Sequence, residues 1–204
     1  MLAIIPIRKG SVRIKNKNLQ KINEKTLVEI TLDKAIKSNA FTKIIVFHDY
    51  SQLNFKKIYK TVDFIKRPKK ISGKKNTTEE TLKYFFRQYP ENKIFIDFCI
   101  LQVTSPLRKI STIKNGIKKF YKTKKNSLIS VKFKHIIDKN SKKIFYIMGK
   151  KKFIPNGVLY ISNIKNFLKT GKIYNKNSEF VILSSKESID IDTFEDLKIA
   201  RSLI

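Results

Sequence analysis

The chain has 204 residues, a length that fits one domain with a substantial core. Its 45 Lys and Arg against 16 Asp and Glu give a formal net charge of +29. The lysines are spread along the whole chain, however, and no helix-turn-helix, zinc-finger or aromatic RNA-binding pattern accompanies them, which argues against nucleic acid as the main partner. The single cysteine, Cys99, excludes an intrachain disulfide and a thiolate metal site.

No apolar run approaches the length of about 18 residues that a membrane-spanning helix needs. The N-terminus enters an apolar run directly, without a signal-peptide pattern. We therefore expect a soluble, cytoplasmic protein with no membrane partner.

The first apolar run, Leu2 to Ile5, predicts a buried strand that leads into a polar loop. Around Gly10 and Ser11 this loop carries the cationic residues Arg8, Lys9, Arg13, Lys15 and Lys17. Open α/β sheets bind ligands in loops that leave the carboxyl ends of strands, and glycine lets the backbone approach an anion. The pattern predicts a phosphate-binding loop, although it matches neither GxxxxGK[ST] nor GxGxxG; a solvated basic loop is the alternative.

Helical and strand patterns then alternate along the chain. Helices are predicted over 27–38, 51–59, 78–88, 111–121 and 193–203. Strands are predicted over 44–47, 62–65, 94–101, 128–133, 158–161 and 181–183, and the near-continuous apolar run 94–101 is typical of a central strand. Ser111 is the predicted N-cap of its helix, and Asp192 with Glu195 predicts a capping box for the last one.

The regular alternation stops at residues 134–152, where turn patterns at 138–142 and 148–150 predict a hairpin. No repeat, linker or low-complexity segment divides the chain. We therefore expect residues 1–204 to form a single three-layer α/β domain with an inserted hairpin.

Five segments occur in an order that points to one family. They are IIPIRKGSVRIKNKNL at 4–19, RP at 67–68 with TT at 77–78, LQVTSPLR at 101–108, PNGVLYI at 155–161 and SIDIDT at 188–193. Together they resemble the acylneuraminate cytidylyltransferases, or CMP-sialic acid synthetases, from residue 3 to about residue 200. The resemblance implies a Rossmann-like sheet of the nucleotide-diphospho-sugar transferase type. It also implies that an acidic 2-keto sugar attacks the α-phosphate of CTP in the presence of Mg²⁺, giving a CMP-sugar and pyrophosphate.

The same resemblance assigns the site residues. The positions implied to bind the nucleotide are Arg8, Ser11, Lys17, Asn18, Arg67, Thr77 and Thr78. Arg8 is our choice for the leading electrostatic catalyst, because a guanidinium can donate two hydrogen bonds to a phosphate in a bidentate arrangement. Thr78 could equally be only a helix N-cap.

Two aspartates in the DID run, Asp190 and Asp192, are implied to be the Mg²⁺ ligands, and Asp192 is assigned a catalytic role. Hard Mg²⁺ prefers a few carboxylates with phosphate oxygens, but residues that alternate along an extended chain need a turn to reach one metal. The alternative is that Asp192 only caps the last helix. The positions implied to line the sugar pocket are Gln102, Thr104 and Asn156.

Two departures from the family bear on activity. Val12 stands where the family has a phosphate-directed lysine, so Arg13 or Lys9 would have to substitute, and we add Arg13 to the nucleotide-binding set. Ile154 stands where the family has an arginine that pairs with the sugar carboxylate, so Lys151 or Lys152 would supply that charge, or the substrate differs.

The region between Val131 and Asn156, which the resemblance implies to build the dimer contact, is also short here. A homodimer is therefore an open expectation. Two alternatives to a sialic-acid-like substrate remain: a degenerate member that binds nucleotide without turnover, and a cytidylyltransferase for another acidic sugar such as 3-deoxy-octulosonic acid.

Overall fold

Strand β1 (Leu2–Ile7) lies at the centre of the structure because both of its faces are apolar. Ala3, Ile5 and Ile7 belong to one hydrophobic core, whereas Leu2 and Ile4 belong to a second core on the opposite face of the sheet. This alternation with a period of two is the side-chain geometry of a strand. The computed structural model describes residues 1–73, 75–133, 146–148 and 151–204.

The described residues form one large sheet with the strand order β10-β7-β9-β6-β1-β4-β5, and β8 pairs with β9 outside this path. Its further strands are β4 (Lys43–His48), β5 (Val62–Lys66), β6 (Asp97–Ile100), β7 (Ser127–Phe133), β8 (Tyr146–Met148), β9 (Lys151–Asn163) and β10 (Glu179–Ile182). Strands β1, β4, β5 and β6 are parallel, and β9 runs antiparallel between β6 and β7. A second, two-stranded sheet pairs β2 (Lys21–Ile22) with β3 (Lys25–Thr26).

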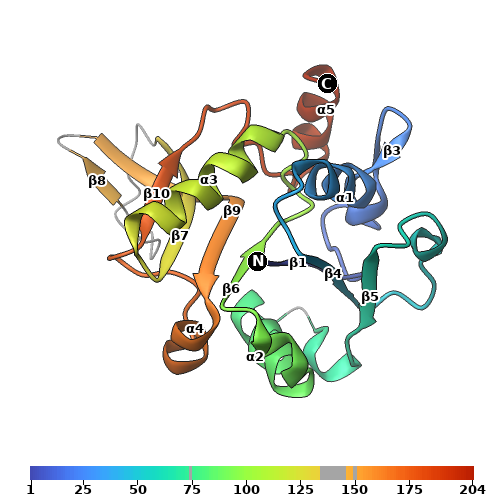
Figure 1. Ribbon diagram of the computed structural model, residues 1–204. Helices are drawn as coiled ribbons and strands as arrows, with labels where there is room; N and C mark the ends of the chain where they lie inside the picture. The colour runs from blue at the N-terminus through green and yellow to red at the C-terminus, as the bar shows by residue number, and fades with distance from the viewer. Residues whose placement is uncertain (74, 134–145, 149–150) are drawn as a thin grey trace.

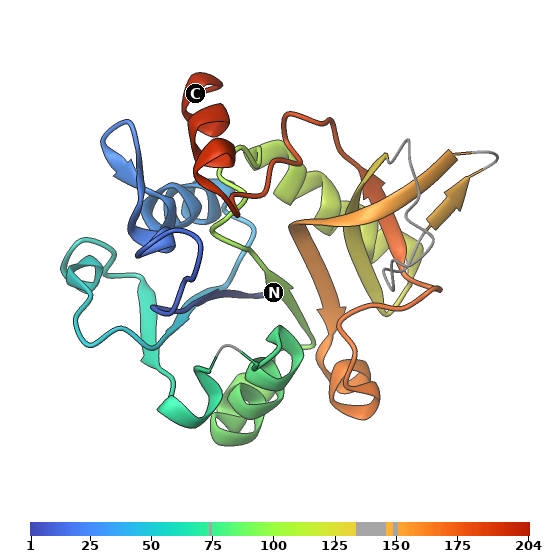
Figure 2. The same cartoon turned by 180° about the vertical axis from the view of Figure 1, so that it is seen from behind.

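Helices cover both faces of the large sheet (Figures 1 and 2). One face carries α1 (Leu27–Ser38), α3 (Ile110–Thr123) and α5 (Phe194–Ser202), and the other carries α2 (Thr78–Gln88) and α4 (Ile164–Thr170). Short 3-10 turns lie between these elements: η1 (Lys17–Leu19), η2 (Asn54–Lys57), η3 (Lys69–Ile71) and η4 (Pro90–Ile94). The predicted three-layer α/β architecture is confirmed.

The predicted helices 27–38 and 78–88 are confirmed to the residue as α1 and α2. Each begins at a threonine with a complete capping box, Thr26 with Glu29 and Thr77 with Glu80. These reciprocal bonds satisfy amides that the first helical turn leaves unpaired.

Three local predictions are wrong. Residues 51–59 form only η2, whose N-cap Leu53 provides no capping side chain. The N-cap of α3 is Lys109, two residues before the predicted cap, so Ser111 lies inside the helix. In α5 the cap is Thr193, paired with Asp196, and not Asp192 with Glu195.

Strand β6 is shorter than the predicted 94–101 run. Ile94 and Ile96 are 80% and 74% exposed, because residues 90–94 form η4 instead. The four residues of β6 itself are all buried, as expected of a central strand.

The inserted hairpin is confirmed in part, since β8 pairs antiparallel with β9. Both predicted turns, at 138–142 and 148–150, include residues outside the described part of the chain. Strand β9 extends well beyond the predicted 158–161, and helix α4 was not predicted.

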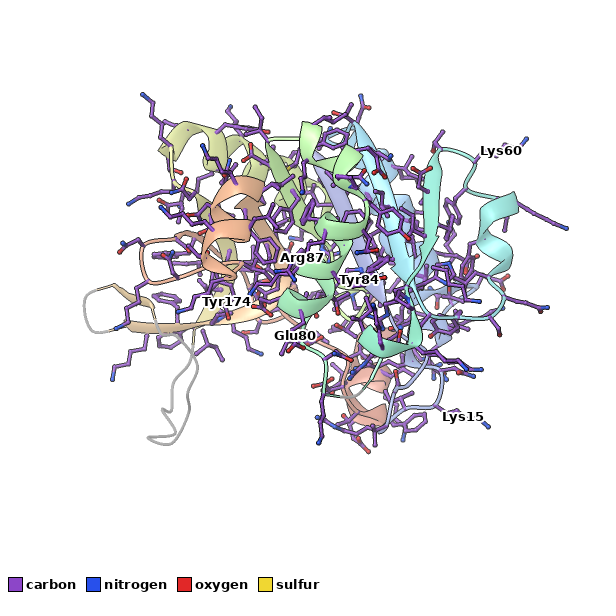
Figure 3. All side chains as sticks on the ribbon, turned by 90° about the horizontal axis from the view of Figure 1, so that it is seen from below. Lys15, Lys60, Glu80, Tyr84, Arg87 and Tyr174 are labelled. Carbon is purple, nitrogen blue, oxygen red and sulfur yellow. The ribbon has the colours of Figure 1, made fainter. Side chains whose placement is uncertain are left out.

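Basic side chains point outward from distant parts of the molecule, as Lys15 and Lys60 do in Figure 3. In the same view Glu80, Tyr84 and Arg87 lie along α2. Among the helices of the described residues, none combines the length and the apolar character that crossing a bilayer requires.

Candidate active site

The parallel strands β1, β4, β5 and β6 end at one edge of the sheet, where a cavity of about 420 Å³ opens. Ligands of open α/β sheets bind at this edge. Twelve of the thirteen predicted site residues line the cavity: Arg8, Ser11, Arg13, Lys17, Asn18, Arg67, Thr77, Thr78, Gln102, Thr104, Asp190 and Asp192. Segments that are far apart in the sequence therefore meet at one site.

The basic loop, residues 8–18, connects β1 to η1 and is shaped by its own backbone contacts. Asn18 is buried, and its amide donates to the main-chain oxygen of Arg8 at 2.9 Å. The Tyr50 hydroxyl donates to the same oxygen at 3.3 Å. Asn18 thus holds the loop that carries Arg8, which is a structural role in addition to the predicted one.

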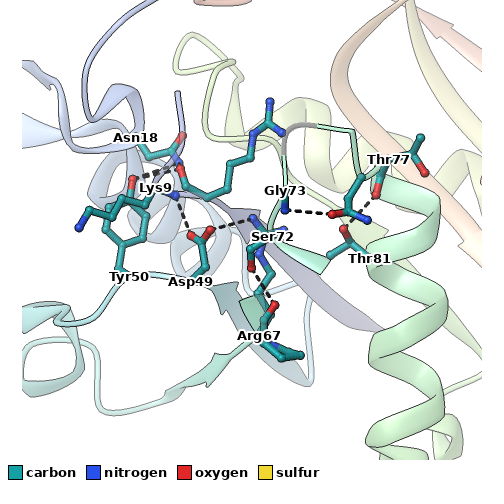
Figure 4. A network of polar contacts seen from close by, with 12 residues as sticks. Lys9, Asn18, Asp49, Tyr50, Arg67, Ser72, Gly73, Thr77 and Thr81 are labelled. Carbon is teal, nitrogen blue, oxygen red and sulfur yellow. Dashed lines mark hydrogen bonds and ion pairs between the residues drawn. The ribbon is translucent and has the colours of Figure 1, made fainter. Parts of the chain in front are cut away.

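Asp49, which follows β4, joins this loop to the next strand (Figure 4). Its carboxylate accepts the main-chain amide of Lys9 at 2.6 Å and forms an ion pair with Arg67 at 3.6 Å. Arg67 is 6% exposed, and burial lowers its pKa although Asp49 counteracts this effect. A positively charged guanidinium at a cavity wall favours an anionic ligand.

The N-terminus of α2 forms another wall. The hydroxyl of Thr77 accepts the amide of Glu80 at 3.1 Å, so Thr77, and not Thr78, is the cap. Asn76, which the sequence analysis did not single out, also lines the cavity and accepts the amide of Gly73 at 2.9 Å. The aligned amides at this helix end give the wall a partial positive charge.

Asp190 and Asp192 both line the cavity, although they alternate along the chain on either side of Ile191. Ile191 between them is buried, and its amide donates to the Thr104 oxygen at 2.8 Å. Asp190 is exposed to the cavity, yet the protein around it limits its hydration and raises its pKa, and the charge of Asp192 acts in the same direction. Two carboxylates with this mutual repulsion form a site that favours a cation.

Two cations of the basic loop already face Asp192. Lys17 Nζ lies 2.8 Å from Asp192 Oδ1, and Arg13 Nη1 lies 3.5 Å from Oδ2. The alternative in which Asp192 only caps α5 is wrong, because Thr193 takes that position. Lys9 is exposed and contributes its main-chain amide to Asp49, so of the two replacements considered for the lysine missing at Val12, Arg13 is the one whose side chain lines the cavity.

Gln102 and Thr104 follow β6 and line the cavity, but Asn156 does not. Asn156 is buried, accepts the Ser130 hydroxyl at 2.5 Å and donates to the Ser188 hydroxyl at 2.8 Å. These bonds tie β9 to β7 and to the segment before Asp190. Asn156 uses its amide within the fold and does not line this cavity, and its assignment to the sugar pocket stays a prediction.

Sequence reasoning missed several contributors to the site. Asp49 and Tyr50 order the basic loop, and Arg108 and Glu187 lie buried behind the wall formed by Gln102 and Thr104. A charged residue that is buried without a nearby apolar pattern gives no local sequence signal; only the three-dimensional contacts reveal it.

Comparison with known proteins agrees with the geometry. The chain is 29% identical to the N-acylneuraminate cytidylyltransferase of Escherichia coli O18:K1:H7 over 98% of this chain and 51% of that protein. It is 25% identical to the CMP-N,N'-diacetyllegionaminic acid synthase of Legionella pneumophila over 100% of this chain and 96% of that one. The chain therefore spans about half the length of the N-acylneuraminate cytidylyltransferases that it matches.

A solved structure of CMP:2-keto-3-deoxy-manno-octonic acid synthetase complexed with CTP superposes with a TM-score of 0.71 at 11% identity, covering 99% of this chain and 97% of that one. This likeness shows the fold alone, and it confirms the predicted sheet. The family model described as Cytidylyltransferase matches residues 2–201. With the cavity and the match over nearly its whole length taken together, the chain belongs to the cytidylyltransferase family.

Proposed function

We propose that this protein transfers the cytidylyl group of CTP to a nonulosonic, sialic-acid-like 2-keto sugar acid. The anomeric hydroxyl oxygen forms a bond to the α-phosphorus while the bond to the β-phosphate breaks, and pyrophosphate and a proton are released. The observation that carries this proposal is the convergence of the basic loop and two carboxylates on one cavity at the carboxyl edge of the sheet.

The basic loop suits the triphosphate. Reaction at phosphorus depends mainly on positioning and on charge stabilisation, which the cavity offers through Arg8, Arg13, Lys17 and Arg67. Arg8 is the proposed electrostatic catalyst. The Ser11 hydroxyl and the N-terminus of α2 add hydrogen-bond donors along the same wall.

Asp190 and Asp192 are the residues that would hold Mg²⁺. Among the described residues no group of three or more His, Cys, Asp or Glu side chains gathers around one point, so phosphate oxygens and water would complete the coordination. When bound, Mg²⁺ would supply positive charge to the triphosphate. Burial raises the pKa of Asp190 and the charge of Asp192 adds to this rise, and a bound cation would stabilise both carboxylates, which supports this assignment.

The cation for the sugar carboxylate is proposed to be Lys132, and not Lys151 or Lys152. Ile154, at the position of the family's arginine, is directly paired across the antiparallel strands with Lys132, so the two side chains share one face. Lys132 is half-buried, and its charge lowers the pKa of Asp190. Lys132 does not itself line the cavity, and its influence on Asp190 is the observation that supports the proposal.

The main test is a pyrophosphate-release assay with CTP, Mg²⁺ and a panel of sialic, legionaminic, pseudaminic and 3-deoxy-octulosonic acids. We expect turnover with one of the first three acids. Turnover with the octulosonic acid alone would replace the proposed substrate class. CTP binding without turnover of any acid would favour the degenerate module, for which Val12 and Ile154 are the specific observations.

A thermal-shift measurement tests nucleotide choice separately. CTP with Mg²⁺ should raise Tm in the concentration-dependent manner of a ligand that binds only the folded state, and ATP and GTP should do so weakly. Equal stabilisation by all nucleotides would contradict cytidine selectivity. The expected homodimer is tested by light scattering on the same sample.

A further inference from the structure

Arg108 is a fully buried charge behind the cavity, with a relative exposure of 0%. Its Nε donates to the Val158 oxygen at 2.6 Å, and its Nη2 donates to the Gln102 oxygen at 2.7 Å. Burial lowers its pKa to about 10, against the opposing influence of Glu187. Burying a guanidinium is costly unless hydrogen bonds offset the lost hydration. The two carbonyls that Arg108 binds therefore indicate what it holds in place.

One carbonyl belongs to the 102–108 loop and the other to β9. Successive turns, Ser105 N to Gln102 O and Arg108 N to Ser105 O, both at 3.3 Å, fold this loop back so that Arg108 reaches Gln102. On β9, Gly157 has a φ of +80°, and a Cβ there would lie 3.7 Å from Gln102 Oε1. The Gln102 side chain is therefore held between β9 and the cavity.

The same loop supports the carboxylate segment, residues 187–192. Thr104 O accepts the amide of Ile191, the residue between the two aspartates, at 2.8 Å. Glu187 accepts the main-chain amide of Lys109 at 3.1 Å and also the Thr112 hydroxyl. A change in the loop at Gln102 is thus transmitted by direct hydrogen bonds to the segment that carries Asp190.

We propose that Arg108 is a positioning residue that fixes Gln102 and Thr104 and, through the Ile191 amide, the two carboxylates. It does not line the cavity and acts through these neighbours. The backbone of the basic loop is held by other contacts, through Asn18, Tyr50 and Asp49, and the side chains of Lys17 and Arg13 link it to Asp192. Arg108 therefore governs the half of the cavity away from the basic loop. The expected effect on catalysis rests on the proposed function. The expected effect on the order of residues 102–108 and 187–192 does not.

Arg108→Lys is the sharpest variant, because it keeps the charge and loses the planar donor pair that reaches two carbonyls. We expect kcat/KM for the sugar acid to fall about tenfold or more, while the Kd for CTP measured without Mg²⁺, to which the basic loop contributes, changes by less than about twofold. Phe167→Leu is the control for general loss of stability, because Phe167 is buried in the core against α2 and lies outside the site. It should lower Tm without changing the kinetics of the sugar acid more than the binding of CTP.

Amide hydrogen exchange gives a readout that needs no turnover. In Arg108→Lys, peptides covering 102–108 and 187–192 should exchange faster, whereas peptides covering 8–18 should not. If Arg108→Lys does not fold, Glu187→Gln keeps the acceptor oxygen, removes the charge that offsets Arg108, and should change exchange in the same two segments.

The outcomes are separable. Unchanged exchange in 102–108 and 187–192, or an equal loss for both substrates that matches Phe167→Leu, would overturn the positioning role. A wild-type protein that turns over no sugar acid but shows the expected exchange pattern would overturn the proposed function and support the role of Arg108.

Discussion

The two sides of the cavity hold their functional groups differently. On the basic loop, the Arg13 side chain is 65% exposed and that of Lys17 is 17% exposed, and main-chain contacts shape the loop beneath them. Around Gln102 and Asp190, buried polar side chains fix the geometry, including Arg108, Asn156 and Glu187. Exposed cations can replace one another, and we propose that Arg13 takes the place of the cation missing at Val12. A buried hydrogen-bond network leaves an unpaired group when one member is lost.

The largest effect that we expect comes from Asp192→Asn, at the point where the two sides meet. Its carboxylate faces Lys17 and Arg13 and is a proposed Mg²⁺ ligand, so turnover should fall at least about 100-fold at saturating Mg²⁺. Pyrophosphate release measures this loss. Tm should stay close to that of the wild type, because Thr193 caps α5. Asp63→Asn, which breaks the surface pair with Lys43, is the matched control; near-normal turnover in Asp192→Asn would remove the metal assignment.

Asn156→Ala should destabilise the buried hydrogen-bond network beside the cavity. It leaves the hydroxyls of Ser130 and Ser188 without their amide partner, so the free energy of unfolding should fall by about 1–3 kcal/mol. Urea denaturation of the unliganded protein measures this change. An unchanged unfolding free energy with a raised KM for the sugar acid would support the prediction that Asn156 lines the sugar pocket.

Arg13→Ala and Lys9→Ala test the exposed side as a pair. Arg13 lines the cavity, so its removal should lower kcat/KM for CTP about tenfold, or about 1.4 kcal/mol of transition-state stabilisation. Lys9 contributes a main-chain amide that alanine retains, and its variant should behave like the wild type in the same steady-state assay. Indifference to both substitutions would leave Arg8 and Lys17 as sufficient, and equal losses would contradict the distinction drawn between them.

The smallest effect is expected from Lys132→Gln. Its charge acts on the Asp190 side of the cavity, so KM for the sugar acid should rise about threefold to tenfold while KM for CTP stays constant. Substrate titrations at fixed saturating co-substrate provide the measurement. Lys152→Gln is the comparison: a larger rise in that variant would transfer the sugar-side charge to Lys152.

Sequence patterns predicted the elements whose signals are local. Helices α1 and α2 have apolar residues at helical spacing, and both were predicted, although their caps Thr26 and Thr77 were not. The strand predicted over 94–101 was too long because Ile94 and Ile96 are apolar but exposed. Hydrophobicity alone does not distinguish a strand from an exposed turn. In α5 the competing caps Asp192 and Thr193 are adjacent, and composition does not separate them.

The predicted site residues meet at one cavity where a motif places them at the ends of parallel strands. Arg8, Arg67 and Gln102 each follow such a strand, so topology alone brings them together. Asn156 could not be judged in this way, because its partners lie 26 and 32 residues away in the chain. Whether a buried amide faces a ligand or another side chain is decided by packing that no local pattern encodes.

Strand β9 has a consequence for the order in which the protein can fold during synthesis. Strands β1, β4, β5 and β6 pair among themselves, so the half of the sheet that carries the basic loop is complete within the first hundred residues. Strand β7 follows β6 in the chain but reaches it only through β9, whose residues are made later. Because the N-terminus leaves the ribosome first, the half of the sheet that carries the basic loop can form early, whereas Asp190 and Asp192 join it only after β7, β9 and β10 have also been made.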